Sequence, residues 1–177
     1  MILKKQKKKF RTGQVMIETL VTISVVMIGL LGVLVLVSRS IAFNYDASEQ
    51  FVATYLASEG IEVVKGVIDE NYAANVTWDE GISNGQYQVN YKDDSLGSSI
   101  SGFENAQPLN FDSVTGIYDY ISGAPTPFKR LVGISKIDNG GIGVSNEIIV
   151  VSTVEWLSRG ATKKVTLEDH FFDWRKE

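Results

Sequence analysis

Cysteine is absent from this 177-residue chain, and histidine occurs once, as His170. Without cysteine no disulfide and no thiolate metal site can form. A site built from several histidines is excluded as well. We expect none of the scattered serines to act as a nucleophile, and for His170 we expect an ordinary structural role. The prediction is therefore a chain that is not an enzyme, with no catalytic residues, no metal and no cofactor.

Ionisable side chains are nearly absent from one long stretch of the sequence. The 24 residues from Gln14 to Val37 contain a single ionisable group, Glu18. About 20 apolar residues cross a bilayer as a helix, because lipid offers no partner for backbone N–H and C=O groups. We predict a transmembrane helix over residues 14–37.

A basic segment precedes this apolar stretch. It contains no acid and six cations, which are Lys4, Lys5, Lys7, Lys8, Lys9 and Arg11. Cations flanking a membrane helix hold that end in the cytoplasm, so residues after Ser38 are expected on the other side. A secretory signal would have a shorter apolar run followed by a small-residue cleavage site, which is not seen after Val37.

The junction between the basic and apolar segments resembles the class III leader of type IV pilins and type II secretion pseudopilins. The residues that carry the resemblance are Gly13 followed by Gln14-Val15-Met16-Ile17-Glu18. It implies cleavage by a prepilin peptidase after Gly13, so that Glu18 becomes the fifth residue of the mature chain. It also implies that the Glu18 carboxylate meets the N-terminal amine of a neighbouring subunit. N-methylation of residue 14 is a family feature, although Gln14 stands where phenylalanine is usual.

From the residues alone, Glu18 has a second interpretation. A carboxylate inside a bilayer costs roughly 2.5 to 3.5 kcal/mol, so it is rare there without a partner or a task. Glu18 lies only about one turn into the helix, and its side chain could instead reach water at the cytoplasmic interface. Both interpretations remain open at this point.

The helix is expected to continue beyond the membrane to about Asp69. No proline occurs before Pro108. Apolar residues at three- and four-residue spacing, interleaved with charges, predict an amphipathic helix with one buried face. These residues are Ile41, Tyr45, Val52, Tyr55, Leu56, Ile61, Val63, Val64, Val67 and Ile68. The run from Leu56 to Val64 resembles the second helical half of PilV-type minor pilins.

The remaining sequence predicts loops and then an antiparallel meander. Between residues 70 and 126 the periodicity fades; we predict a strand at 87–91, and a short strand is one interpretation of 116–121. Alternating residues predict three strands, at 128–137, 146–157 and 163–169, with turns at 138–141 and at Arg159-Gly160. Val165 and Leu167 are expected to share a face with Ile148 and Val154. The closing residues 171–174 again resemble PilV-type minor pilins.

Together these features predict an α+β chain with the type IV pilin fold. The predicted segments are a leader at 1–13, a membrane half-helix at 14–37, an amphipathic half-helix at 38–69, a variable connecting region at 70–126 and a meander at 127–177. Residues 38–177 would form one ectodomain. The net charge of −4 becomes −10 once the six leader cations are removed, which argues against a nucleic-acid partner.

The predicted function is that of a structural subunit, a minor pilin or pseudopilin, in a type IV pilus-like filament. Its expected partners are other pilin subunits, the prepilin peptidase, an inner-membrane assembly platform and, before assembly, the lipid bilayer. We expect a single-pass membrane protein with a cytoplasmic N-terminus that later reaches the cell surface. Two alternatives are a signal-anchored binding protein or adhesin that does not polymerise, and an anchored hydrolase with a polar cleft.

Overall fold

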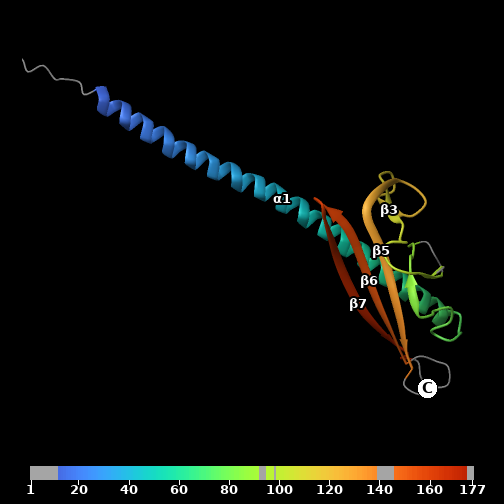
Figure 1. Ribbon diagram of the computed structural model, residues 1–177. Helices are drawn as coiled ribbons and strands as arrows, with labels where there is room; N and C mark the ends of the chain where they lie inside the picture. Colours follow the sequence, from blue (N-terminus) through green and yellow to red (C-terminus); the bar gives the residue numbers. More distant parts are fainter. Residues whose placement is uncertain (1–11, 92–94, 98, 139–145, 175–177) are drawn as a thin grey trace, which may run out of the picture. The chain divides into compact units, whose positions relative to one another are not determined.

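The computed structural model describes residues 12–91, 95–97, 99–138 and 146–174. The fold is α+β, as predicted, with one long N-terminal helix and an antiparallel sheet of seven strands (Figure 1). The chain divides into two compact units, Met1–Tyr45 and Asp46–Glu177, which we call unit 1 and unit 2. The predicted leader and most of the predicted turn at 138–141 lie outside the described residues.

The helix α1 spans Thr12–Ala73, and the boundary between the two units falls inside it. It ends four residues later than predicted, at a cap formed around Asn75. Asn75 has a positive φ of 55°, and the Val76 amide donates to the Asn71 carbonyl at 3.2 Å. Asparagine is one of the few residues that accept this left-handed conformation, which satisfies the last free carbonyls of a helix.

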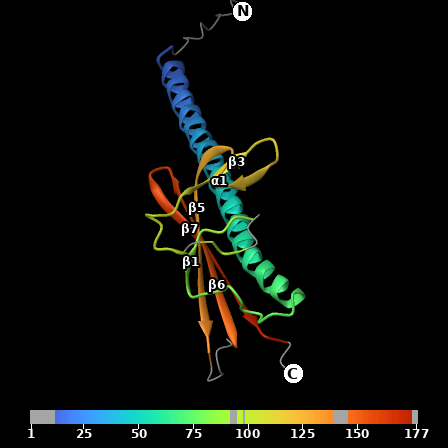
Figure 2. The ribbon, with the colours of Figure 1, turned by 90° about the vertical axis from the view of Figure 1, so that its right-hand side faces the viewer.

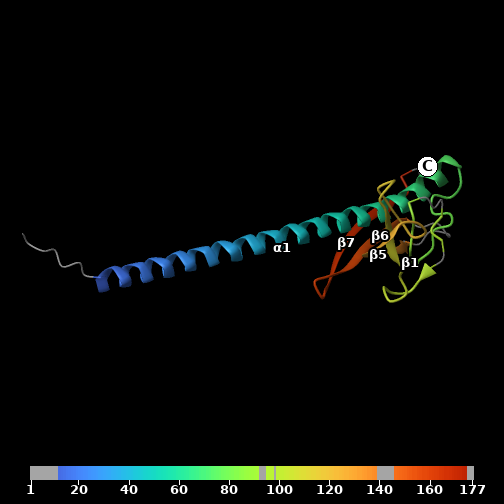
Figure 3. The ribbon, with the colours of Figure 1, turned by 90° about the horizontal axis from the view of Figure 1, so that it is seen from above.

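The sheet of unit 2 is organised around β5 (Ala124–Ile137). One side of β5 pairs with β6 (Glu147–Ser158), which pairs in turn with β7 (Ala161–Phe172). The other side pairs with two short strands, β1 (Gly85–Tyr87) and β3 (Pro108–Asp112). These carry β2 (Ser99–Ile100) and β4 (Ile117–Asp119) as their outer neighbours. The first 28 residues of unit 2, which belong to α1, lie across one face of this sheet (Figures 2 and 3).

The predicted meander is confirmed by β5, β6 and β7. Val154 lies opposite Val165, and Ser152 lies opposite Leu167, so both β7 residues share the buried face of β6 as expected. Arg159 and Gly160 connect β6 to β7, with φ values of 49° and 81°. Two successive positive φ values make the type I′ turn that matches the twist of a tight hairpin.

The core of unit 2 consists of two apolar clusters between α1 and the sheet. One gathers around Val64, Ile68, Trp78 and Ile148. The other gathers around Leu56, Leu109, Phe128, Val154 and Trp156.

Between the two clusters α1 lies close against the sheet at Gly60. A Cβ on Gly60 would lie 2.5 Å from Ser152 Oγ and 2.9 Å from Val132 Cγ2. Gly60 therefore sits in this helix because a larger residue would collide with the sheet, although glycine lowers helix propensity.

The buried face of α1 differs from the predicted one. Ile41 and Tyr45 belong to unit 1 and are 52% and 69% exposed. Tyr55 is 68% exposed, whereas the small residues Ala53 and Ala57 are fully buried. The prediction was wrong at these positions because it weighed apolar size, whereas a helix pressed against a sheet favours small side chains at the contact.

The strand predicted at 87–91 is also largely wrong. Only Tyr87 belongs to β1, and the chain leaves the ladder at Gln88. The Val89 carbonyl accepts from Arg130 Nη2 at 2.6 Å, and Asn90 Nδ2 donates to Asp119 Oδ1 at 2.9 Å. These buried contacts replace strand pairing. The short strand considered at 116–121 is present as β4.

Candidate functional site

The predicted processing and assembly residues lie in the first two turns of α1. Gly13 and Gln14 are its second and third residues, and Glu18 follows four residues after Gln14. Four residues rise about 6 Å along a helix axis, slightly more than one turn. All three residues are exposed. The predicted leader residues Lys7, Lys8, Lys9 and Arg11 lie outside the described part of the chain.

Glu18 is the one charged side chain on this part of the helix. Nearby hydroxyl groups donate to the backbone of the preceding turn: Thr19 to the Met16 carbonyl at 3.0 Å and Thr22 to the Glu18 carbonyl at 2.7 Å. Ser24 makes the same kind of bond to Leu20 at 2.8 Å. Because these hydroxyls are satisfied within the helix, the Glu18 carboxylate is the polar group that a lipid or protein neighbour would meet.

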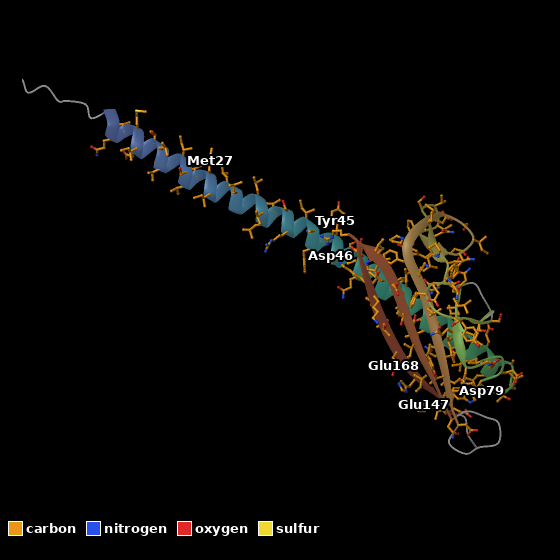
Figure 4. The ribbon with its side chains drawn as sticks, viewed as in Figure 1. Met27, Tyr45, Asp46, Asp79, Glu147 and Glu168 are labelled. Atoms are coloured by element: carbon orange, nitrogen blue, oxygen red, sulfur yellow. The ribbon has the colours of Figure 1, made fainter. Side chains whose placement is uncertain are left out.

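Large apolar side chains cover α1 between Val15 and Val37 and are 50% to 72% exposed. They project to every side of the helix around Met27 (Figure 4). A helix that is apolar all round requires lipid or other helices around it. α1 is long and apolar enough to cross a membrane.

In unit 2, the Arg130 guanidinium joins three parts of the chain. Arg130 lies on β5 and is completely buried. Its Nη1 donates to Glu59 Oε1 at 2.9 Å and to the Leu56 carbonyl at 3.0 Å, both on α1. Its Nη2 donates to the Val89 carbonyl at 2.6 Å. A buried cation needs such partners, so Arg130 fixes the helix and the start of the connecting region to the sheet.

A second ionic contact holds the segment after the helix. Lys136 Nζ lies 2.7 Å from Asp79 Oδ2 and donates to the Ile82 carbonyl at 2.9 Å. The Lys136 amide donates to Asn84 Oδ1 at 2.6 Å. Asp79 is 5% exposed, and a buried carboxylate is costly unless it has a charged partner. Lys136 is that partner. Two residues of β5 thus hold the connecting region. Lys136 binds it between Asp79 and Asn84, and Arg130 binds it at Val89.

An open groove of about 580 Å³ lies on the outer side of α1 in unit 2. Phe51 and Tyr55 project from the helix and are 74% and 68% exposed. Tyr91 and Tyr118 line the opposite side, and Glu59 is the one charged lining residue. This groove was not predicted from the sequence, because Tyr55 was assigned to the buried face of the helix. The sequence feature that could have predicted the groove is the i, i+4 spacing of Phe51 and Tyr55, because it places two aromatic rings side by side on one face of the helix.

His170 lies near the end of β7 and contacts two carboxylates. Its Nδ1 is 2.5 Å from Glu147 Oε1, and its Nε2 is 3.0 Å from Glu168 Oε1. The two glutamates come from neighbouring strands (Figure 4). The hydrogen bond to Glu147, and then that to Glu168, raise the pKa of His170 above its ordinary value, because they favour the imidazolium. The contact is an exposed electrostatic link between β6 and β7.

A G-x-S-x-G sequence and the acidic side chains are the remaining candidates for chemistry. Residues 81–85 read Gly-Ile-Ser-Asn-Gly, which has the spacing of a nucleophile elbow. Ser83, however, precedes β1 and follows a turn, so the strand-turn-helix context of that motif is lacking. Among the described residues, no group of three His, Asp or Glu side chains could hold a metal ion.

Over the described residues, this is an α+β protein with one long helix. That helix begins with a segment long and apolar enough to cross a membrane, and its part within unit 2 packs on an antiparallel sheet. No protein-family model, curated protein or solved structure matches this chain.

Proposed function

We propose that this chain is a structural subunit of a type IV pilus-like filament, a minor pilin or pseudopilin that a prepilin peptidase cuts after Gly13. The observation that carries the proposal is the placement of Glu18. It is the one charge on an otherwise apolar helical segment, four residues after the residue that cleavage would make the new N-terminus.

The physical argument starts from the cost of that carboxylate. In lipid, Glu18 would be expensive without a partner. Cleavage after Gly13 would create a cationic α-amino group at Gln14, and the same group on a neighbouring copy can pair with Glu18. The pairing would fix how far one helix is displaced along the next, while the apolar side chains of residues 15–37 exchange lipid for protein contacts.

The second half of α1 has a different role in this proposal. Within unit 2 it packs on the sheet through Ala53, Leu56 and Ala57, and Arg130 ties it to β5. Because this part of the helix is fixed to its own sheet, unit 2 would act as one body. The subunit would be joined to its neighbours by the apolar segment.

The proposal is tested by Glu18→Ala in the full chain, with Thr22→Ala as the matched control one turn later. We expect Glu18→Ala to be cleaved normally but recovered in sheared filaments at least ten-fold less than the parent chain, since about 1.4 kcal/mol of lost pairing is a factor of ten. Thr22→Ala should be recovered normally. Equal recovery of the two variants would contradict the role given to Glu18.

A second candidate function is a membrane-anchored binding protein that does not polymerise. The observation that favours it is the open groove with exposed Phe51 and Tyr55, which no other described side chain covers. Exposed aromatic rings around a hollow surface are typical of binding sites. This function predicts an uncut chain and no effect of Glu18→Ala on any surface activity.

A further inference from the structure

The strand β7 is an open edge of the sheet. It is 12 residues long and, among the described residues, pairs only with β6. It is the outermost long strand of the sheet (Figure 1). An edge strand presents unpaired backbone N–H and C=O groups that can pair with another strand.

The hairpin turn determines which residues of β7 carry these unpaired groups. In a two-residue type I′ hairpin the residues flanking the turn, here Ser158 and Ala161, form a hydrogen-bonded pair, and pairs then alternate along the strands. The even-numbered residues from 162 to 172 therefore direct their backbone groups away from β6. In agreement, the His170 amide donates to Oδ1 of Asp169, at 2.9 Å.

The charges along this edge are self-complementary. The strand reads Lys163-Lys164-Val165-Thr166-Leu167-Glu168-Asp169, with two cations before the centre and two acids after it. If two copies of β7 pair antiparallel about a two-fold axis at Thr166, Lys164 lies opposite Glu168 of the other copy. On the other face Lys163 lies opposite Asp169, and Val165 lies opposite Leu167. Opposite charges directly across a strand pair are stabilising.

The register about Thr166 is distinguished from its alternatives by charge. With the two-fold axis at Lys164 or at Glu168, like charges would lie opposite each other. An edge that is only protected against aggregation uses charges that repel an incoming strand, whereas here the sign reverses at the centre. Lys164 is exposed and forms no ion pair within the described residues, so it is available to a partner.

We propose that β7 is a docking strand for β7 of a second copy of this chain, paired antiparallel about Thr166. Lys164 and Glu168 carry the recognition, with Glu168 shared between Lys164 of the other copy and its own neighbour His170, whose Nε2 lies 3.0 Å from Glu168 Oε1. Lys163 contributes less, because its Nζ is already 2.6 Å from Asp46 Oδ1.

The same contacts determine the polarity of the pair. Lys163 near the start of β7 contacts Asp46, and Asp173 just after β7 accepts from the Tyr72 hydroxyl at 3.3 Å. Residues 46–73 of α1 thus run in the same direction as β7. Antiparallel pairing therefore places the two Asp46 residues at opposite ends of the pair. The pairing does not depend on the filament proposal.

The test uses the absence of cysteine. Thr166→Cys in the full chain in detergent places two thiols together at the two-fold axis, where a short bismaleimide can link them. Thr162→Cys is the matched control, because its two copies would lie about 27 Å apart, eight residues at about 3.4 Å each. We expect Thr166→Cys to be crosslinked at least ten-fold more than Thr162→Cys. Equal crosslinking, or none with Thr166→Cys, would overturn the proposal.

Charge variants test the recognition itself. Adding Lys164→Glu to the Thr166→Cys chain should abolish crosslinking, because two glutamates would then face each other. Adding Glu168→Lys as well restores opposite charges and should restore crosslinking. Crosslinking that persists in the single charge variant, or stays absent in the double one, would show that the pairing is wrong.

Discussion

Replacing Gly60 by alanine is expected to destabilise unit 2, although alanine is the better helix former. The gain in helix propensity is about 0.8 to 1.0 kcal/mol. Against it, the new Cβ would lie 2.5 Å from Ser152 Oγ and 2.9 Å from Val132 Cγ2, and both residues are fully buried. Overpacking of this kind costs about 1 to 3 kcal/mol. The difference is a net loss of up to about 2 kcal/mol in the free energy of unfolding, and the two contacts below 3.0 Å favour the upper part of that range.

Gly66→Ala is the matched control for this prediction. Gly66 lies on the same helix, is exposed, and no atom beyond its chain neighbours and the helix backbone lies within 4 Å of its Cβ position. Alanine there gains helix propensity without a collision, so it should stabilise the protein by about 0.5 to 1 kcal/mol. One substitution is therefore expected to have opposite signs at two positions of a single helix.

The assay is urea unfolding of the full chain in detergent, followed by tryptophan fluorescence. Trp78 and Trp156 are each 3% exposed, and every tryptophan lies in unit 2, so the signal reports on that unit. Gly60→Ala should lower the midpoint concentration of urea and Gly66→Ala should raise it. If Gly60→Ala is as stable as Gly66→Ala, the close approach of helix and sheet is not present in solution.

Two further predictions concern the ionic contacts. Arg130→Met leaves Glu59 without its partner and should lower the free energy of unfolding by about 3 kcal/mol. This is the lower end of the range for a broken buried pair, because the Glu59 side chain is 22% exposed. The control Lys65→Met, at an exposed position, should change the urea midpoint little. The hydrogen bond to Glu147, and then that to Glu168, raise the pKa of His170 in the folded protein. The imidazolium therefore stabilises the fold fully below pH 6.5, and this stabilisation is lost as the pH rises through the folded-state pKa. In His170→Gln the urea midpoint should no longer fall over this pH range. If the variant shows the same dependence of the midpoint on pH as the parent chain, the prediction is wrong.

The regular parts of the fold could be predicted from the sequence. The alternation in β5, β6 and β7 and the Arg159-Gly160 turn depend on neighbouring residues, so they are visible in a local pattern. The short strands β2 and β3 could not be predicted, because two and five residues are too few to show an alternating pattern. The contacts of Arg130 could not be predicted either, because its partners lie far away in the sequence, on α1 and at Val89.

Of the candidate sites, Glu18 could be predicted from the sequence and the aromatic groove could not. Glu18 stands out because a single charge interrupts an apolar run, which requires no knowledge of the fold. The aromatic groove required knowing which side of α1 faces the sheet. Gly60, Ala53 and Ala57 determine that side through their small size, and apolar periodicity alone assigned Tyr55 to it. Packing against a partner, rather than hydrophobicity, decided the orientation of the helix.

The central claim is tested most directly by the N-terminal residue of the protein. Mass spectrometry would be applied to the chain taken from membranes and from sheared surface material of cells with and without a prepilin peptidase. The proposal predicts a chain that begins at Gln14 when the peptidase is present and at Met1 when the peptidase is deleted or when Gly13→Ala is introduced. A surface-exposed chain that still begins at Met1 in cells with the peptidase would contradict the proposal and favour an anchored binding protein.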